Sequence, residues 1–240
     1  MIPFKGLVKT EQEGLHKYQL RLLTYKTELY YDLNKCIGCL FCIQTCPKES
    51  ISRTVEKGVA YNVVDMETCA MCGICDYICP TGAFQFFIEG VRKNLLVDNK
   101  SLPQLTVTEI NGKEQKLRKF VDGKLIIEMT KWTDDCKSVA DVCPSGCLSM
   151  NAENKLEINE DLCIYCGNCE RESMNLEKEG LIKVVRRRLL YKGKIDEFSA
   201  PWNDIVKKMV SFEVMAKELK GKAGEEAANR VNTLYKHLLP

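Results

Sequence analysis

The 240-residue sequence predicts an α+β fold of two tandem cysteine-rich modules, with a β insertion between them and a C-terminal helical extension. Two complete copies of one cysteine spacing predict the first module, and a third, incomplete copy predicts the second. Alternating apolar residues indicate strands in the insertion, and apolar residues at helical spacing indicate terminal helices. We expect an N-terminal extension (1–28), the first module (29–90), the insertion or connector (91–127), the degenerate second module (128–182), and a basic segment with helices (183–240).

Eight of the fourteen cysteines lie in the two complete copies. Each copy has three cysteines spaced by two residues, followed after three more residues by Cys-Pro. This C-x2-C-x2-C-x3-C-P run binds cubane [4Fe–4S] clusters, and its fourth cysteine ligates the cluster of the other copy. The sequence therefore predicts cluster A on Cys36, Cys39, Cys42 and Cys79, and cluster B on Cys69, Cys72, Cys75 and Cys46.

Zinc and disulfide bonds are the alternatives for these cysteines. Structural zinc usually takes two C-x2-C pairs rather than a run of three with a distant fourth. Disulfides need an oxidising compartment, and residues 1–14 lack the apolar core and cleavage site of a secretory signal. Thiolates kept reduced indicate a cytoplasmic and anaerobic setting.

The incomplete copy predicts one further cluster. Short extended stretches precede all three cysteine runs, at 29–32, 61–65 and 156–159, and a Cys143-Pro144 pair resembles the end of a complete copy. Three further cysteines follow at the usual spacing of two residues. We expect cluster C on Cys163, Cys166, Cys169 and Cys143.

The fourth cluster of a complete pair is expected to be lost. The position that corresponds to a fourth cysteine after Cys163 is Ser173, with no proline after it, and upstream of Cys143 only Cys136 remains where a run of three ligands should be. If Cys136 is the middle ligand of a run, Thr133 and Val139 occupy the flanking ligand positions. Three clusters are therefore expected, and a fourth one with non-cysteine ligands near Cys136 is the alternative.

Cys147 follows Cys143-Pro144 where the complete copies have Ser50 and Ala83. A small buried side chain suits that position, so Cys136 and Cys147 are expected to be non-ligands close to the cofactor. The alternatives are a spare thiolate beside cluster C and a disulfide between these two cysteines.

The insertion contains two strand-like stretches, at 105–110 and 124–129. Asn111-Gly112 and Asp122-Gly123 are hairpin signals, so we expect a small β structure rather than a solvated linker.

Two helices are expected in 202–240, with a break at Gly221 and Gly224. Their apolar stripes pack back on the modules or dock on a larger subunit. The basic run 183–188 indicates a solvated face, with an acidic partner surface as the alternative. His16 and His237 have no ligand pattern and are expected to be surface or packing residues.

Several classes of protein are excluded by composition. The sequence has 35 Lys and Arg against 33 Asp and Glu, so it carries no basic footprint for nucleic acid. No apolar run approaches the roughly 18 residues of a transmembrane helix. No nucleophile–base set, P-loop or dinucleotide fingerprint is present, so we expect no catalysis by this chain alone.

The motif-bearing segments, about 29–90 and 128–175, resemble bacterial-type dicluster ferredoxins. Val142-Cys143-Pro144 followed by Cys147 is similar to seven-iron ferredoxins, where a free cysteine follows the cross-over ligand, and this resemblance implies an unligated Cys147. The whole chain resembles the archaeal polyferredoxins, among them the polyferredoxin subunit of formylmethanofuran dehydrogenase.

The motifs and the resemblance together predict an iron–sulfur electron-transfer protein. We expect it to relay single electrons through three [4Fe–4S] clusters as a subunit of an anaerobic oxidoreductase complex, with a larger catalytic subunit as its partner and a soluble ferredoxin as a second candidate. A free diffusible ferredoxin and a redox-sensing or assembly module are the alternatives.

Overall fold

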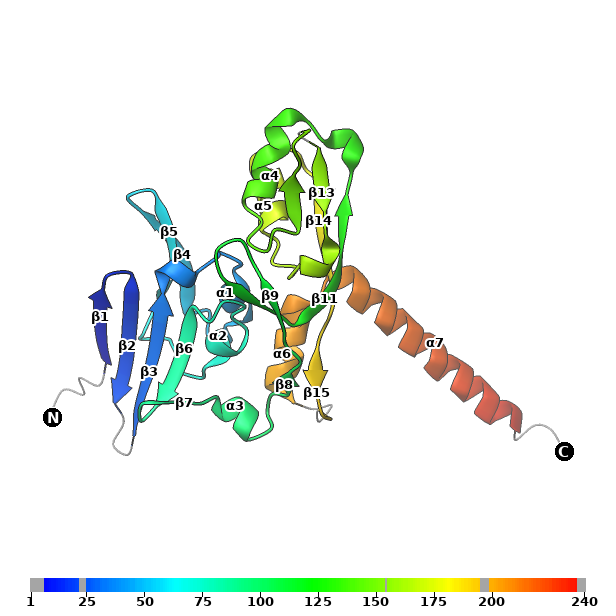
Figure 1. Cartoon of the computed structure of the whole chain (residues 1–240). Helices are drawn as coiled ribbons and strands as arrows, with labels where there is room; N and C mark the ends of the chain where they lie inside the picture. Colours follow the sequence, from blue (N-terminus) through cyan, green and yellow to red (C-terminus); the bar gives the residue numbers. More distant parts are fainter. Residues whose placement is uncertain (1–6, 22–24, 154, 195–198, 237–240) are drawn as a thin grey trace.

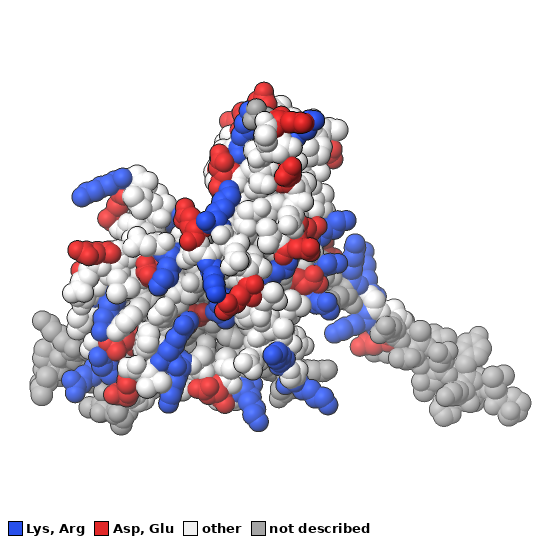
Figure 2. Space-filling view, in the orientation of Figure 1, with Lys and Arg blue, Asp and Glu red and all other residues white. Residues whose placement is uncertain are grey.

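The computed structural model describes residues 7–21, 25–153, 155–194 and 199–236, which form a mixed α/β structure (Figure 1). A blue-to-cyan unit with a five-stranded sheet lies at one side, and a green-to-yellow unit stands above it. Helix α6 lies at their junction, and helix α7 projects away from the body. Lys and Arg are interspersed with Asp and Glu over the face in Figure 2, as expected for a net charge of +2. Within the described ranges no helix is both long and apolar enough to cross a membrane.

The N-terminal sheet is antiparallel, in the order β1-β2-β3-β6-β7. Large side chains alternate along its strands and bury one face, among them Tyr18, Tyr31 and Phe84. That face packs against the β4-β5 hairpin and the cysteine-bearing segments. The strands are β1 (Leu7–Gln12), β2 (Leu15–Arg21), β3 (Lys26–Asp32), β6 (Phe84–Ile88) and β7 (Val91–Arg92), and the hairpin is β4 (Ile51–Glu56) and β5 (Val59–Val64).

The first unit follows a strand–helix–hairpin–helix–strand order from β3 to β6, with the short helices α1 (Phe41–Thr45) and α2 (Ile74–Tyr77). The second unit repeats this order between two paired strands, β11 and β14. Its elements are β11 (Val121–Ile127), α4 (Lys137–Asp141), β12 (Leu148–Met150), β13 (Leu156–Ile158), α5 (Asn168–Asn175) and β14 (Ile182–Leu189). Single 3-10 turns lie at Leu33–Lys35, Met129–Lys131, Asp134–Cys136 and Glu160–Leu162.

The segment between the units contains α3 (Leu95–Asp98), β8 (Gln104–Leu105), β9 (Thr108–Asn111) and β10 (Lys116–Lys119). β9 and β10 form the hairpin predicted at Asn111-Gly112. The hairpin predicted at Asp122-Gly123 is wrong, because these residues lie inside β11 at a bulge opposite β14. A Cβ on Gly123 would meet the Val185 oxygen at 2.6 Å, so this glycine allows a close approach between strands instead of a turn.

The basic run 183–188 is part of β14 rather than a wholly solvated face. Val184 is buried, and Arg187 and Arg188 are exposed and pair with Asp122. A last short strand, β15 (Tyr191–Lys192), pairs with β8 of the insertion.

The C-terminal helices divide differently from the prediction. Helix α6 (Ala200–Met209) ends before Ser211, and α7 (Phe212–Lys236) continues through Gly221 and Gly224. The apolar face of α6 is buried at Trp202, Ile205 and Met209. In contrast, Phe212 and Leu219 of α7 are 79% and 68% exposed. His16 packs in the N-terminal sheet at 7% exposure, whereas His237 lies outside the described residues.

Candidate iron–sulfur sites

The three cysteine runs share one backbone conformation. The third and fifth residues of each run have positive φ, and these residues are Gly38 (66°) and Leu40 (64°), Met71 (49°) and Gly73 (77°), and Tyr165 (54°) and Gly167 (83°). Left-handed conformations are unfavourable for residues with a side chain, and they persist where a site requires them. The same pattern in three separate loops therefore indicates a common structural demand.

This conformation directs main-chain N–H groups at the cysteine sulfurs. The N–H two residues after each middle cysteine donates to its sulfur, from Phe41 to Cys39, from Ile74 to Cys72 and from Asn168 to Cys166. Concave loops of this kind bind anions and iron–sulfur clusters. A helix then begins at the sixth residue of each run, namely α1, α2 and α5.

The fold brings Cys79 to the first cysteine run. Burial raises the pKa of Cys39 well above its usual value, and the nearby thiols of Cys79 and Cys42 raise it further. Burial, then Cys79 and Cys36, likewise raise the pKa of Cys42. The four cysteines predicted to hold cluster A thus lie together, although Cys79 follows the other run.

The cysteines predicted for cluster B line one small cavity. Cys46 contributes to it from the first Cys-Pro pair, beside Cys69, Cys72 and Cys75 of the second run. Cys42 lines the same cavity and raises the pKa of Cys75, for which burial is the larger cause. The sites predicted for clusters A and B are therefore adjacent.

A second small cavity is lined by the four cysteines predicted for cluster C and also by Cys147. The Cys147 thiol lies within hydrogen-bonding reach of the sulfurs of Cys143 and Cys163, to one of which its single proton can donate at a time, and it lowers the pKa of both. With a further contribution from Ser145, the pKa of Cys143 falls to about 5. Cys147 is thus a hydrogen-bond donor beside the predicted ligands and more than a packing residue.

The region expected to have lost a cluster lacks the shared conformation. No residue from 128 to 142 has a positive φ. Cys136 is fully buried and contacts the Thr133 hydroxyl at 3.4 Å. Ser173 is also buried, and its hydroxyl donates to the Glu170 oxygen at 2.7 Å within α5. These side chains do not line the cavity of the third run.

The cysteine sets fit cubane clusters. None of the fourteen cysteines is joined to another by a disulfide, so Cys136 and Cys147 are not bonded to each other. In the described ranges no three His, Cys, Asp or Glu side chains converge as closely as one metal ion requires. A [4Fe–4S] cubane distributes four thiolates over four irons, so its ligands surround a larger volume than zinc ligands do. The N–H groups directed at sulfur further suit this group.

Asn62 is a site residue that the sequence interpretation missed. Its amide nitrogen lies 3.5 Å from the Cys42 sulfur and 3.9 Å from the Cys36 sulfur, and the side chain is 2% exposed. The Tyr31 hydroxyl accepts from the Asn62 N–H at 3.1 Å. A polar residue among the apolar residues of a strand is the only sequence signal that could have indicated it.

The loop of the third run packs on the loop of the first. The Asn168 amide donates to the Ile37 oxygen at 2.7 Å, and Arg171 donates to the Gly38 oxygen at 2.6 Å. Cys166 lies close enough to raise the pKa of Cys39, after the larger effects of burial and nearer thiols. The site predicted for cluster A thus neighbours both other sites.

Arg186 of β14 occupies the junction between these two loops. Its guanidinium donates to the Tyr165 oxygen at 2.8 Å and lies 5.0 Å from the centre of the Phe41 ring. Burial lowers the pKa of Arg186, and the thiols of Cys166 and Cys39 oppose that effect. Sequence reasoning treated this arginine as one of a basic run, because only the strand pairing distinguishes it.

Paired cysteine-bearing loops on an antiparallel framework define the class as a ferredoxin-like iron–sulfur protein. Residues 35–83 match the 4Fe-4S dicluster domain. The chain is 35% identical over 74 residues to one uncharacterized ferredoxin of Methanocaldococcus jannaschii, covering 31% of this chain and 94% of that protein. A second uncharacterized ferredoxin of that organism is 38% identical over 53 residues, covering 22% of this chain and 81% of that protein. The chain therefore belongs to the 4Fe-4S ferredoxin family.

A solved structure supports the fold over most of the chain. It belongs to a formate dehydrogenase–heterodisulfide reductase–formylmethanofuran dehydrogenase complex from Methanospirillum hungatei. One chain of it aligns with a TM-score of 0.66 at 18% identity, over 88% of this chain and 93% of that chain. The two chains share a fold, which extends well beyond the dicluster domain. The resemblance to iron–sulfur ferredoxins that the sequence suggested is confirmed.

Proposed function

We propose that this protein relays single electrons through three [4Fe–4S] clusters as a subunit of a larger oxidoreductase complex. The proposal of three clusters rests on one backbone observation. Each of the three cysteine runs has a pair of residues in the left-handed conformation, and no residue from 128 to 142 has that conformation. A bound [4Fe–4S] cluster accepts and donates one electron, and the protein positions it and adjusts its potential.

The proposed ligand sets remain those of the sequence. Cys36, Cys39, Cys42 and Cys79 hold cluster A, Cys69, Cys72, Cys75 and Cys46 hold cluster B, and Cys163, Cys166, Cys169 and Cys143 hold cluster C. The proximity of Cys79 to the first run and of Cys46 to the second supports the exchange of fourth ligands.

The repeated order of elements supports two tandem ferredoxin-like modules, the second with one cluster. β11 and β14 pair as β3 and β6 do, and each pair encloses two short helices and a hairpin. We therefore propose that the second module extends over 121–189, beyond the 128–182 expected from the cysteines. The segment between the modules is the proposed β insertion.

Contacts between the loops favour a linear order of sites, B–A–C. Cys42 of the first run lines the cavity of the second, and Asn168 and Arg171 of the third run bind the main chain of the first. The chain thereby holds the middle site rigidly between its neighbours, as a relay of electrons requires.

Assembly into a complex is supported by two observations. The Methanospirillum chain of the same fold is part of a multi-enzyme complex. The α7 helix extends from the body with exposed apolar residues that a freely diffusing carrier does not need. The proposed partner is a larger redox subunit, and this chain alone is not proposed to catalyse a reaction.

Iron analysis of anaerobically purified protein tests the number of clusters. We expect about twelve irons per chain, and about eight in a Cys163→Ser variant that has lost cluster C. About sixteen irons would mean that the Cys136 region holds a fourth cluster. Copurification with a large catalytic subunit distinguishes the complex subunit from a free ferredoxin.

A further inference from the structure

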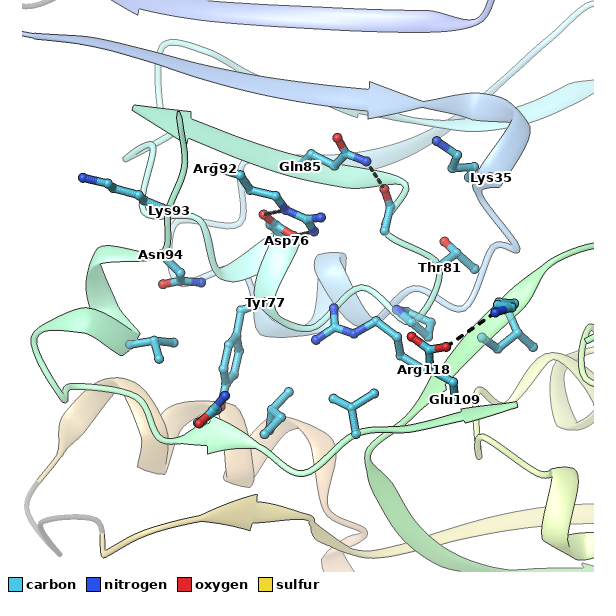
Figure 3. A pocket seen from close by; sticks show the side chains of 18 of the residues that line it. Lys35, Asp76, Tyr77, Thr81, Gln85, Arg92, Lys93, Asn94, Glu109 and Arg118 are labelled. Carbon is cyan, nitrogen blue, oxygen red and sulfur yellow. Dashed lines mark hydrogen bonds and ion pairs between the residues drawn. The ribbon is translucent and has the colours of Figure 1, made fainter. Parts of the chain in front are cut away.

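A cavity of about 820 Å³ lies between the first unit and the insertion (Figure 3). α2 and the 80–82 loop form one side, α3 and strands β8 and β10 form the other, and Lys192 of β15 lies at the edge. This volume falls in the range of roughly 300–1,000 Å³ that is typical of small-molecule sites. None of the cysteines lines it, so it is distinct from the candidate cluster sites.

The cavity carries an excess of positive charge. Asp76 and Glu109 are its two carboxylates, against six basic side chains: Lys35, Arg92, Lys93, Lys116, Arg118 and Lys192. Arg92 binds Asp76 through two nitrogens, and Lys116 lies 3.8 Å from Glu109. Both carboxylates are thus neutralised by basic residues of the cavity itself.

Lys35 pairs with Asp32 at 3.0 Å, so three basic side chains of the cavity have no carboxylate partner among the described residues, namely Lys93, Arg118 and Lys192. Like charges that share a cavity repel one another, and an anion bound among them relieves the repulsion. Arg118 in particular presents a planar set of donors that suits phosphate and carboxylate groups.

One wall of the cavity is apolar and rigid. The Tyr77 hydroxyl donates to the Pro103 oxygen at 2.8 Å, which fixes the ring, but Tyr77 and the neighbouring lining residue Leu105 are each only 7% exposed. Most of the accessible apolar surface of the lining comes from Val97, which is half-buried, and Val107, which is 36% exposed. Figure 3 shows the Arg118 side chain reaching toward Tyr77. A flat ring therefore finds an apolar surface close to an anion-binding group.

The floor of the cavity continues into the loop that carries Cys79. Arg118 donates from its side chain to the Cys79 oxygen at 3.1 Å and from its main chain to the Pro80 oxygen at 2.7 Å. The Thr81 hydroxyl lies 3.5 Å from the Cys79 sulfur. These contacts connect β10, which carries Arg118, to the loop that carries Cys79 and thereby fix the two sides of the cavity relative to each other.

We propose that this cavity binds a small anionic molecule with a planar ring, whose phosphate or carboxylate contacts Arg118 within the positive field of Lys93 and Lys192 and whose ring packs against the apolar part of the lining. The binding site goes beyond the proposed electron relay and does not depend on it. An acidic segment of a partner protein is the competing occupant, but the volume of about 820 Å³ and the apolar part of the lining favour a ring-bearing small molecule.

The test uses AMP as the probe, because it combines one phosphate with a planar ring. Adenosine has the same ring without the charge, and inorganic phosphate has the charge without the ring. Calorimetry on the full-length protein with its clusters bound is expected to detect one AMP site, with adenosine and phosphate each at least about tenfold weaker. The visible absorbance of the clusters confirms that the protein is intact.

Variants then assign the site. Arg118→Gln is expected to weaken AMP binding at least about tenfold, and Arg118→Lys to restore part of the affinity. Because Arg118 also supports the Cys79 loop, the double variant Lys93→Gln/Lys192→Gln provides a second test without such contacts. Lys124→Gln, an exposed position on β11, is the matched control and is expected to bind as the wild type does.

Three results would overturn the proposal. These are no AMP binding at about 1 mM, equal binding of AMP and adenosine, or an unchanged affinity in the double lysine variant. A glutamate-rich peptide that binds more tightly than AMP and displaces it would also overturn it, and would make the cavity a docking surface for an acidic protein segment.

Discussion

Arg186 donates a hydrogen bond of 3.2 Å to the main-chain oxygen of Cys166 and thereby places a positive charge beside the loop of the third cysteine run. The same guanidinium lies over Phe41, which precedes Cys42 in the first run. The main chain of Arg186 is held in turn by Ser211, with two hydrogen bonds of 2.9 Å. One side chain of β14 thus contacts two candidate cluster sites, and the start of α7 fixes its strand.

Replacing Arg186 by glutamine is expected to lower the midpoint potential of cluster C, because a nearby positive charge stabilises the reduced, more negative cluster. At an effective dielectric constant of about 20, a unit charge roughly 10 Å away contributes about 1.7 kcal/mol, or roughly 70 mV for one electron. Potentiometric titration followed by electron paramagnetic resonance measures this shift.

Arg187→Gln is the matched control, since Arg187 is adjacent in sequence but exposed and paired with Asp122. Equal potentials in the Arg186 and Arg187 variants would contradict a special role for Arg186. Arg186→Lys is expected to shift the potential less than Arg186→Gln, because it keeps the charge.

Cys46→Ser is expected to damage cluster B and to leave cluster A largely intact, because Cys46 lies in the cavity of the second run. Cys79→Ser is expected to do the reverse. Spectroscopy of the two variants measures which cluster is converted or lost. Damage to the cluster of the first run by Cys46→Ser would disprove the exchange of fourth ligands.

Cys147→Ala is expected to retain about twelve irons, since cluster C has four other cysteines. The variant loses the thiol that can donate a hydrogen bond to the sulfur of Cys143 or Cys163, two proposed ligands, so the potential of cluster C is expected to fall. Cys147→Ser keeps a donor and is expected to stay close to the wild type. Loss of about four irons in Cys147→Ala would make Cys147 a ligand.

Truncation after Met215 is expected to leave the clusters assembled and to weaken binding to a larger redox subunit by at least about tenfold. The structure restricts the deletion to 216–240, because Trp202, Ile205 and Met209 of α6 are buried. Pull-down of partner chains measures association, and cluster absorbance reports folding. Undiminished recovery of partners would argue against α7 as a docking helix, and Leu219→Glu tests its exposed apolar face in the full chain.

As the pH falls from neutral to about 5, the free energy of unfolding of the wild-type protein is expected to decrease. The part of this decrease that comes from His16 is expected to be absent in a His16→Gln variant. His16 is buried against the rings of Tyr18, Tyr31 and Tyr61, and its Nδ1 atom has no hydrogen-bond partner among the residues that the structure describes. Burial lowers its pKa in the folded chain, an effect that Glu11 and Glu56 oppose and Lys9 reinforces.

The sign follows from the protons bound. Because the pKa of His16 is lower in the folded chain, the folded chain binds fewer protons than the unfolded chain when the pH falls below the unfolded pKa of about 6.5. The stabilisation associated with neutral His16 is therefore fully present above that pH. It is lost as the pH falls through the folded pKa. Thermal unfolding at several pH values measures the difference between wild type and variant. His237→Gln is the control, and an identical pH dependence in wild type and His16→Gln would refute the prediction.

Much of the local structure was predictable because its signals lie close together in the chain. The spacing of Cys36, Cys39 and Cys42 is the one expected of ligands that surround a single cluster, and a glycine at position 112 indicates a hairpin by its own conformational preference. The Asp122-Gly123 signal failed because a close strand partner, Val185, accounts for that glycine. The helix break predicted at Gly221 and Gly224 failed because an isolated glycine weakens a helix without ending it.

The sequence by itself determined the family and the type of cofactor, and it predicted the grouping of the cysteines, because ligand number and spacing are properties of the chain. Only the tertiary structure decided which loops are neighbours, that Arg186 rather than Arg187 faces the junction, and that the insertion closes a basic cavity over the Cys79 loop. These features arise from pairing between β11 and β14 and from packing between residues more than a hundred positions apart, such as Asn168 and Ile37. Such long-range contacts depend on the sum of many weak interactions, and no local pattern in the sequence encodes them.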